Sequence, residues 1–260
     1  MPDERVTCTI EEGIARVLLN NPPMNALDMD TRLALERVFQ DLDRKRDQVR
    51  VVVLAGAGDK AFAAGADIKA FLELEPETAK RRLMRTHAIF NRVEGFVRPV
   101  IAAIQGYCLG GGLELALCAD IRYADPGAVF GFPEVNLSIF PGNGGTVRAL
   151  HFLGLGRFKE LVYTGRRLEA EEARRYGLVE QVSAPGRVME EALELAGRIA
   201  RRGPLGVAAA KQVINRQRNL PLAEGLELES DHWARLTATW DMKEGARAFL
   251  EKRKPRYQGR

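Results

Sequence analysis

The segment 109–114, with the sequence LGGGLE, constrains the fold of this 260-residue chain more than any other. Three consecutive glycines precede the acidic Glu114, at the point where an apolar, helix-forming stretch begins at Leu113. Glycine lets a backbone adopt conformations and approach ligands in ways that other residues cannot. The start of a helix also presents unpaired N–H groups and a partial positive charge. The segment therefore predicts a tight turn into a helix, with a carboxylate beside any group that those N–H groups hold.

The same glycines have a simpler interpretation, which is close packing of a strand against a helix. A phosphate loop is disfavoured because no Gly-Lys-Ser/Thr follows them, and their spacing does not match a dinucleotide fingerprint. The surrounding stretch 99–119 is nearly as long as a membrane span, but it contains Gln105, Glu114 and four glycines. This composition favours a buried strand, a glycine turn and a buried helix over a membrane helix.

The composition is that of a globular protein with one domain, or with one domain and an appendage. Apolar residues make up 46% of the chain and charged residues 28%. The 39 Lys and Arg residues are offset by 35 Asp and Glu residues, which leaves a net charge of +4. Nucleic-acid binding is not expected, because it needs cations clustered with aromatic residues on one face. A weak positive excess suits a small anionic substrate.

The three cysteines, Cys8, Cys108 and Cys118, share no close pair and no metal-ligand spacing. An odd and sparse set disfavours a disulfide framework and indicates a reducing compartment. The amino-terminal sequence MPDERVTC lacks the basic and apolar pattern of a secretory signal. We therefore expect a cytoplasmic protein that holds no metal and binds no membrane.

Strand and helix patterns alternate over the first two thirds of the chain. A hairpin is expected over residues 6–20, then a helix capped by Asp30, and a helix over 113–118 after the glycines. Further strands are expected at 50–54, 100–104, 121–124, 128–130 and 178–182. Further helices are expected at 76–94, 146–152, 157–164, 170–176, 187–201, 205–218, 222–239 and 243–252. This order predicts an α/β core with a helical carboxy-terminal appendage.

A second segment of small residues, AFAAGADIK at 61–69, follows the strand and turn that end at Asp59. No bulky side chain screens the N–H groups of Ala64, Gly65 and Ala66, and a helix is expected to start near Asp67. Two such segments can each direct one N–H group at a single oxygen, which is how an oxyanion hole works. The alternative is two unrelated tight turns.

Two carboxylates stand out as candidates for proton transfer. Glu114 lies among leucines and alanines, and Glu134 follows Pro133 in the expected loop 132–145. A buried carboxylate is costly unless it is hydrogen-bonded or can take a proton. Nucleophilic catalysis has little support, because no Gly-x-Ser-x-Gly is present. Cys108 has no evident base and is interpreted as a buried structural thiol.

Together, these segments resemble the enoyl-CoA hydratase/isomerase (crotonase) family. The motifs are AFAAGADIK, PVIAAIQGYCLGGGLELALCADIRYA, FGFPEVNL and FPGNGGT, in order and with matching spacing, and the resemblance covers nearly the whole chain. It implies an α/β fold, a crotonase-like spiral of ββα units over 1–200. It implies a helical carboxy-terminal region over 201–260 that forms homotrimers, often paired into hexamers. The implied substrate is an acyl-CoA thioester, with coenzyme A as part of the substrate and no separate cofactor.

The resemblance also implies roles for individual residues. The N–H groups of Ala66 and Gly111 would hold the thioester oxygen, Glu114 would orient water and take its proton, and Glu134 would deliver a proton to Cα. The reaction implied is syn addition of water to a 2-enoyl-CoA, giving a 3-hydroxyacyl-CoA. The substrate-binding residues implied are Ala64, Asp67, Ile68, Lys69, Gly110, Phe132, Phe140, Gly142, Trp233 and Lys252.

Several residues depart from the pattern of typical hydratases. Phe132 stands where many have glutamine, Ser138 and Phe140 occupy a loop that is often Gly-Thr-Ile, and Val147 stands where many have glutamine. These positions leave the acyl group open. The alternatives are an enoyl-CoA isomerase, another family acyl-CoA enzyme acting by ring hydration or hydrolysis, and a non-catalytic scaffold or RNA-binding member.

Overall fold

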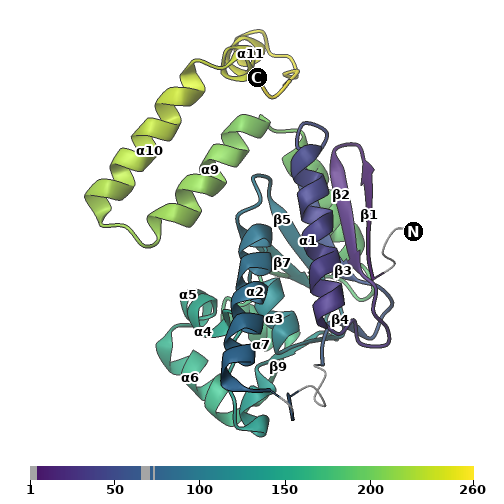
Figure 1. The fold of residues 1–260 in the computed structure, drawn as a ribbon. Coiled ribbons are helices and arrows are strands. Elements are labelled where there is room, and N and C mark those ends of the chain that lie inside the picture. The colour runs from purple at the N-terminus through teal and green to yellow at the C-terminus, as the bar shows by residue number, and fades with distance from the viewer. Residues whose placement is uncertain (1–4, 66–70, 73) are drawn as a thin grey trace.

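The computed structural model describes residues 5–65, 71–72 and 74–260 (Figure 1). Its larger sheet has six strands in the order β1-β2-β3-β5-β7-β10. The hairpin of β1 and β2 is antiparallel, and the other neighbours in this sheet are parallel. The strands of this sheet are β1 (Val6–Glu11), β2 (Ile14–Leu19), β3 (Val51–Gly56), β5 (Val100–Ile104), β7 (Ile121–Ala124) and β10 (Gln181–Val182).

A second sheet of four short strands continues from the first, in the order β4-β6-β8-β9. Its members are β4 (Ala61–Ala63), β6 (Tyr107–Leu109), β8 (Val129–Gly131) and β9 (Arg167–Glu169). Three times in succession, a strand of the larger sheet is followed by a strand of the smaller sheet and then by a helix. The α/β fold of repeated ββα units is thereby confirmed.

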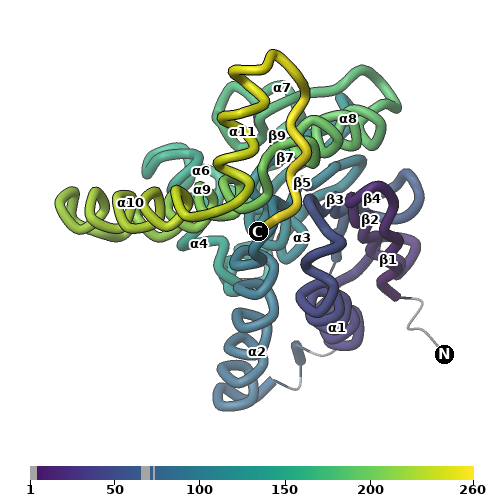
Figure 2. Tube along the Cα trace, turned by 90° about the horizontal axis from the view of Figure 1, so that it is seen from above, coloured from purple at the N-terminus to yellow at the C-terminus, as the bar shows by residue number. Residues whose placement is uncertain are grey.

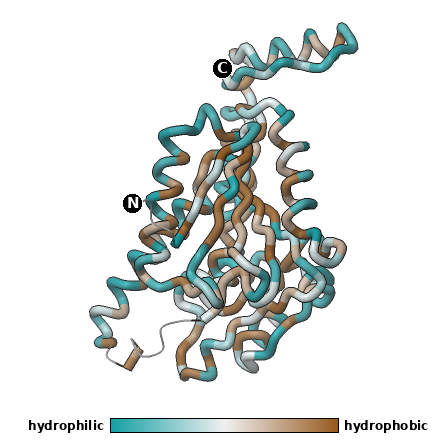
Figure 3. The backbone as a smooth tube through the Cα atoms, turned by 90° about the vertical axis from the view of Figure 1, so that its right-hand side faces the viewer, coloured by the Kyte–Doolittle hydropathy of each residue, from teal (hydrophilic) through white to brown (hydrophobic). Residues whose placement is uncertain are grey.

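Helices cover both faces of the larger sheet (Figures 1 and 2). Strand β3 is buried along its whole length, as expected for a central parallel strand. Val52 and Leu54 belong to the larger apolar cluster, which includes residues of α1 and α2, while Val51 and Val53 belong to a smaller cluster beneath α8. The alternation follows from the two-residue period of a strand. Figure 3 shows hydrophobic segments concentrated in these inner strands.

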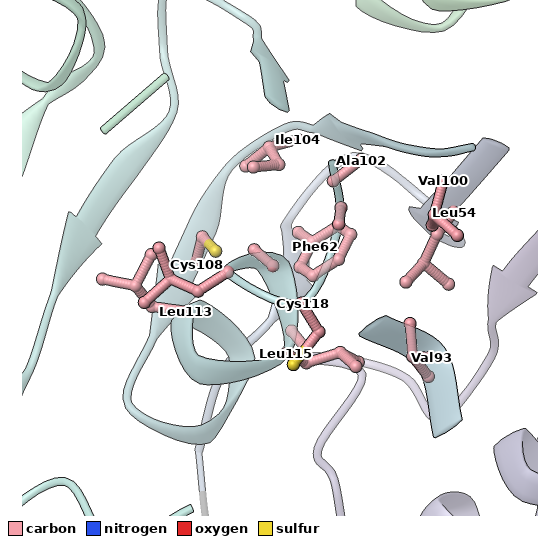
Figure 4. Packing of buried hydrophobic residues seen from close by; sticks show 14 of the residues in the cluster. Leu54, Phe62, Val93, Val100, Ala102, Ile104, Cys108, Leu113, Leu115 and Cys118 are labelled. Carbon is pink, nitrogen blue, oxygen red and sulfur yellow. The ribbon is translucent and has the colours of Figure 1, made fainter. Parts of the chain in front are cut away.

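The helices lie close to their expected positions. They are α1 (Met29–Arg44), α2 (Pro76–Glu94), α3 (Gly111–Ala116), the 3₁₀ helix η2 (Pro133–Leu137), α4 (Gly145–Arg148), α5 (Leu150–Leu153), α6 (Leu155–Thr164), α7 (Ala170–Arg175), α8 (Val188–Ala200), α9 (Pro204–Gln217), α10 (Leu222–Thr237) and α11 (Trp240–Leu250). The short helix α3 is held in the core by Leu113 and Leu115, which pack near Phe62 and Cys108 (Figure 4). Its position is therefore fixed by packing on the larger cluster.

Some expected boundaries are wrong. The cap of α1 is Asp28, whose carboxylate accepts the N–H of Thr31 at 2.8 Å, while Asp30 lies in the first turn. The helix expected over 146–152 is two short helices that meet at Ala149. The strand expected over 178–182 is reduced to the two residues of β10.

The last helices stand apart from the sheets. Helices α9 and α10 pack side by side and extend away from the core, and α11 lies beyond them (Figure 1). The described side chains of α10 include none that is buried, and Trp233 is 69% exposed. The division at residue 200 and the oligomer stay predictions. Among the residues that the structure describes, no helix is long and apolar enough to cross a membrane.

Candidate active site

The three glycines that follow β6 differ in their surroundings: Gly110 precedes α3, and Gly111 and Gly112 are its first two residues. Gly110 has a φ of +54°, and a Cβ atom built on it would lie 3.0 Å from the Glu134 Oε1 atom. A Cβ on Gly112 would lie 1.9 Å from the carbonyl oxygen of Ala63, so only glycine fits against β4. A Cβ on Gly111 would come no nearer than 3.6 Å to another residue. Packing therefore explains Gly112, while Gly110 and Gly111 open the backbone toward the carboxylates.

Glu114 is fully buried, as the sequence predicts. Its Oε1 atom accepts the backbone N–H groups of Asn143 at 2.7 Å and Gly145 at 2.9 Å. Its Oε2 atom accepts the side-chain amide of Asn143 at 2.7 Å. A carboxylate offers about four lone-pair positions, so three donors leave one for a further proton donor. The segment 143–145 thus orients Glu114 and leaves it able to accept a proton from water.

Glu134 lies on η2, across the glycine turn from Glu114. Its Oε2 atom is buried and has no hydrogen-bond partner in the described part of the chain. Burial, followed by the charge of Glu114, raises the pKa of Glu134 to about 7. Burial also raises the pKa of Glu114, but the donors from Asn143 and Gly145 and the charge of Arg32 oppose that shift. The two carboxyl groups are thereby suited to different tasks, with Glu114 as an acceptor and Glu134 as a proton carrier near neutral pH.

The raised pKa of Glu134 predicts a measurable effect on stability. A carboxyl group with a pKa near 4.5 when unfolded and about 7 when folded destabilises the native state progressively as pH rises between those values. We expect Glu134→Gln to stabilise the protein by about 1–2 kcal/mol more at pH 8 than at pH 5, after allowance for solvent screening. Thermal unfolding at the two pH values measures this difference. An equal change at both values would contradict the raised pKa.

The turn and Glu134 line a cavity of about 290 Å³. Its other walls include Leu137, the last residue of η2, and Ile139 and Phe140 from the segment that follows it. The cavity adjoins a larger one of about 600 Å³, and the two share five lining residues, Phe71, Leu137, Ile139, Phe140 and Gly142. The larger cavity is walled mainly by apolar side chains of α2 and of the segment 137–142. Together they form an apolar pocket with a polar end, which is the usual form of a small-molecule site.

The structure brings together five of the predicted site residues along this cavity. They are Gly110, Gly111, Glu134, Phe140 and Gly142. Glu114 lies directly behind the wall, bonded to the lining residue Asn143. The predicted residues Ala66, Asp67, Ile68 and Lys69 lie outside the described residues.

Four predicted substrate-binding residues are not at this cavity. Phe132 is fully buried and packs edge-on against Phe158 with ring centroids 5.7 Å apart, so it is a core residue that supports η2. Ala64 is buried, and its N–H donates to the carbonyl oxygen of Met24. Trp233 lines a separate cavity between α9 and α10, and Lys252 is exposed just after α11.

Sequence reasoning missed two residues of this site. Asn143 belongs to the motif FPGNGGT, and it supplies two of the three donors to Glu114. Arg32 lines the cavity from α1. The signal for Arg32 was available, because Arg32, Leu35, Phe39 and Leu42 share one face of that helix and all four are buried. A cation on such a face is unusual.

Metal and thiol chemistry find no support in the described residues. Among them, no three His, Cys, Asp or Glu side chains are grouped as ligands for a metal ion. Cys108 is a buried free thiol, and burial raises its pKa far from the range of a reactive thiolate. A structural role for Cys108 fits this environment.

A glycine turn opening a helix, two carboxylates flanking it and an adjoining apolar pocket suit proton transfer on a substrate with an apolar segment. The chain belongs to the enoyl-CoA hydratase/isomerase family, whose match spans residues 9–260. It is therefore a crotonase-family acyl-CoA enzyme.

Known proteins similar to this chain include more than one activity. The short-chain-enoyl-CoA hydratase of Clostridium acetobutylicum is 39% identical, over 94% of each chain. The carnitinyl-CoA dehydratase of Salmonella typhi is 37% identical, over 99% of each chain. The crystal structure of an enoyl-CoA hydratase from Bacillus anthracis is 38% identical and superposes with a TM-score of 0.94, covering 98% of this chain and 100% of that one.

Proposed function

We propose that this protein is an enoyl-CoA hydratase, which adds water across the α,β double bond of a 2-enoyl-CoA to give a 3-hydroxyacyl-CoA. The observation that carries the proposal is the pair of carboxylates on either side of the glycine turn, held in different environments. Glu114 accepts three hydrogen bonds, whereas the Oε2 atom of Glu134 has none among the described residues. Hydration needs one group that takes a proton and another that gives one.

The steps follow from this division of roles. Water donates one hydrogen bond to the remaining lone pair of Glu114, which takes the proton as the water oxygen bonds to Cβ. The electron pair of the double bond moves toward the thioester, whose oxygen gains negative charge. The N–H of Gly111, in the first turn of α3, is a donor for that oxygen, and Ala66 is the second donor that we propose. Glu134 then gives its proton to Cα, which completes the addition.

The direct test is hydration of crotonyl-CoA and longer 2-enoyl-CoAs, followed by the loss of absorbance of the conjugated thioester. We expect turnover of at least one 2-enoyl-CoA, with the 3-hydroxyacyl-CoA identified as the product by mass spectrometry. Absence of turnover across a broad acyl panel would overturn the hydratase proposal.

The same assay, run as a function of pH, tests the assignment of acid and base. The acid must be protonated before the reaction, so kcat/KM is expected to fall above pH 7, by up to tenfold per pH unit, as Glu134 ionises. The acid-side decline reports protonation of Glu114, the base. In Glu134→Gln, the remaining rate should lack the decline above pH 7. A wild-type profile that stays flat between pH 6 and 9 would contradict this assignment.

Two related activities are less well supported by the site. An isomerase that moves a double bond can work with one main carboxylate, whereas both glutamates lie at this turn. The carnitinyl group of the Salmonella typhi relative's named substrate carries a quaternary ammonium ion. The cavity walls here include the cations Arg32 and Arg82, which disfavour a cationic acyl group.

Other parts of the proposal concern assembly and coenzyme A. Subunit contacts would cover the exposed apolar residues of α10 and α11, which are Trp233, Phe249 and Leu250. We propose a homotrimer or a hexamer in which Trp233 and Lys252 line the adenine end of coenzyme A across a subunit boundary. Lys69 is proposed as a further coenzyme A contact, and the compartment is proposed to be the cytoplasm.

A further inference from the structure

Arg32 lies where an apolar side chain would be expected. It belongs to the buried face of α1 and is only 8% exposed, yet its side chain lines the cavity that contains Glu134. One guanidinium nitrogen, Nη1, donates to the hydroxyl of Thr86 at 2.6 Å, and this bond ties the side chain to α2. A built Cβ on Gly111 would lie 3.9 Å from the Arg32 Nη2 atom, so the guanidinium reaches the glycine turn.

The guanidinium group has donors to spare. Its Nε atom is buried and has no hydrogen-bond partner in the part of the chain that the structure describes. Burial, with the charge of Arg82, lowers the pKa of Arg32 to about 10, so the group remains cationic at neutral pH. An unsatisfied donor on a buried cation is costly and therefore calls for an explanation, of which a bound anion is one.

Among the other buried arginines, Arg98 also has an Nε atom without a described partner, but both of its Nη atoms donate to backbone carbonyls, of Pro204 and Arg46, whereas Arg122 and Arg148 are paired with carboxylates. Arg122 pairs with Glu180 at 2.5 Å and donates to two backbone carbonyls. Arg148 pairs with Glu94 at 2.8 Å. Arg32 has no carboxylate within 4.0 Å among the described residues, and Glu114 acts on it only through longer-range attraction. The pocket therefore contains a cation whose partner is not supplied by these residues.

A second cation lies farther along the pocket. Arg82 of α2 lines the larger cavity, with its guanidinium carbon 6.0 Å from the centroid of the Phe71 ring. The remaining walls there are mainly apolar, with Leu83, Leu137 and Phe140 among them. A pocket of this kind suits a short hydrocarbon segment that ends in a negative charge.

We propose that Arg32 binds a carboxylate at the far end of the acyl group, and that the preferred substrate is a short 2-enoyl-CoA bearing this second carboxylate. The inference rests on the proposed function, because it assumes that the thioester oxygen lies at Gly111. A planar guanidinium with free N–H groups can hold a carboxylate through charge-assisted, bidentate hydrogen bonds. Arg82 adds a longer-range attraction for the same charge.

The test compares two substrates of equal chain length. Glutaconyl-CoA and 2-pentenoyl-CoA are both five-carbon 2-enoyl thioesters, and they differ in a terminal carboxylate or methyl group. Wild type is expected to favour glutaconyl-CoA in kcat/KM. In Arg32→Leu the ratio of the two kcat/KM values should fall by about 10- to 100-fold, which is the worth of a hydrogen-bonded charge. Arg32→Lys keeps the charge but loses the planar pair of N–H donors. Its ratio of the two kcat/KM values should lie between those of wild type and Arg32→Leu.

Two controls separate recognition from folding. Arg44→Leu removes an exposed arginine from the same helix, which pairs with Asp41 within one turn, and should leave the substrate ratio unchanged. Melting temperatures identify variants that fail to fold. A proportional loss on both substrates in Arg32→Leu would show that Arg32 only positions Glu114 or supports α1, and this result overturns the proposal.

Binding of saturated analogues keeps this inference distinct from the hydratase proposal. Titration calorimetry with glutaryl-CoA and pentanoyl-CoA requires no turnover. Tighter binding of glutaryl-CoA that disappears in Arg32→Leu supports the carboxylate site even if no 2-enoyl-CoA is hydrated. Equal affinity for the two analogues in wild type overturns it, even if 2-pentenoyl-CoA is a good substrate.

Discussion

Glu114→Gln is expected to lower kcat for hydration by roughly 10²–10⁴-fold, which is the usual contribution of a general base or acid. The amide cannot take a proton from water, so the loss is chemical. The same loss is expected for Glu134→Gln, because the acid that protonates Cα is removed. Steady-state rates with the best 2-enoyl-CoA measure both effects.

The fold should tolerate the Glu114→Gln change well. The remaining carbonyl oxygen can still accept the N–H groups of Asn143 and Gly145. The new amide nitrogen would face the side-chain amide of Asn143, and two donors cannot bond to each other. Rotation of the Asn143 amide resolves this, because its Oδ1 atom is buried without a described partner and can accept the new N–H. A stable but slow variant is therefore expected.

Glu190→Gln is a suitable control for both variants. Glu190 pairs with Arg187 on the surface of α8, and both side chains are at least half exposed. Its replacement should leave kcat and the melting temperature nearly unchanged. Near-normal hydration in both active-site variants would contradict the assigned roles. Retention of double-bond migration in Glu114→Gln, together with loss of hydration, would favour an isomerase.

Much of the fold could be predicted because its elements carry local patterns. Strand β5 and helix α2 have the expected bounds, since one is a continuous apolar run and the other begins with Pro76 and keeps a buried face. The smaller sheet was only partly expected: β8 lies within one residue of an expected strand, whereas β4, β6 and β9, also of three residues each, were not expected. Strands of that length are fixed by their pairing with segments that are distant in sequence. A short window of sequence does not contain that pairing.

The site shows the same division between local and long-range information. The burial of Glu114 could be predicted because its neighbours are apolar. Its partner Asn143 could not, because 29 positions separate them and only the fold brings them together. Phe132 was expected at the substrate because it precedes Pro133 and Glu134, but it turns into the core against Phe158. Proximity in sequence to a functional residue therefore did not predict contact with the pocket.

Gly112→Ala is expected to destabilise the protein by at least about 3 kcal/mol, at the upper end of what overpacking costs. The added methyl group would lie 1.9 Å from the Ala63 carbonyl oxygen, which is backbone and cannot rotate away. Helix α3 must therefore shift from β4, and Glu114 and Gly111 shift with it. A lowering of the melting temperature by about 6–12 °C is expected for a chain of this size, together with loss of hydration.

Gly111→Ala is the matched control for this prediction. Its methyl group would meet no atom closer than 3.6 Å, so the melting temperature should stay near that of wild type. If Gly112→Ala had the same melting temperature as Gly111→Ala, close contact with β4 could not be the reason for glycine at position 112. The expected difference in melting temperature between the two variants means that these adjacent glycines have separate roles. Gly112 packs the helix against the second sheet, and in the mechanism that we propose the N–H of Gly111 at the helix start is the donor to the thioester oxygen.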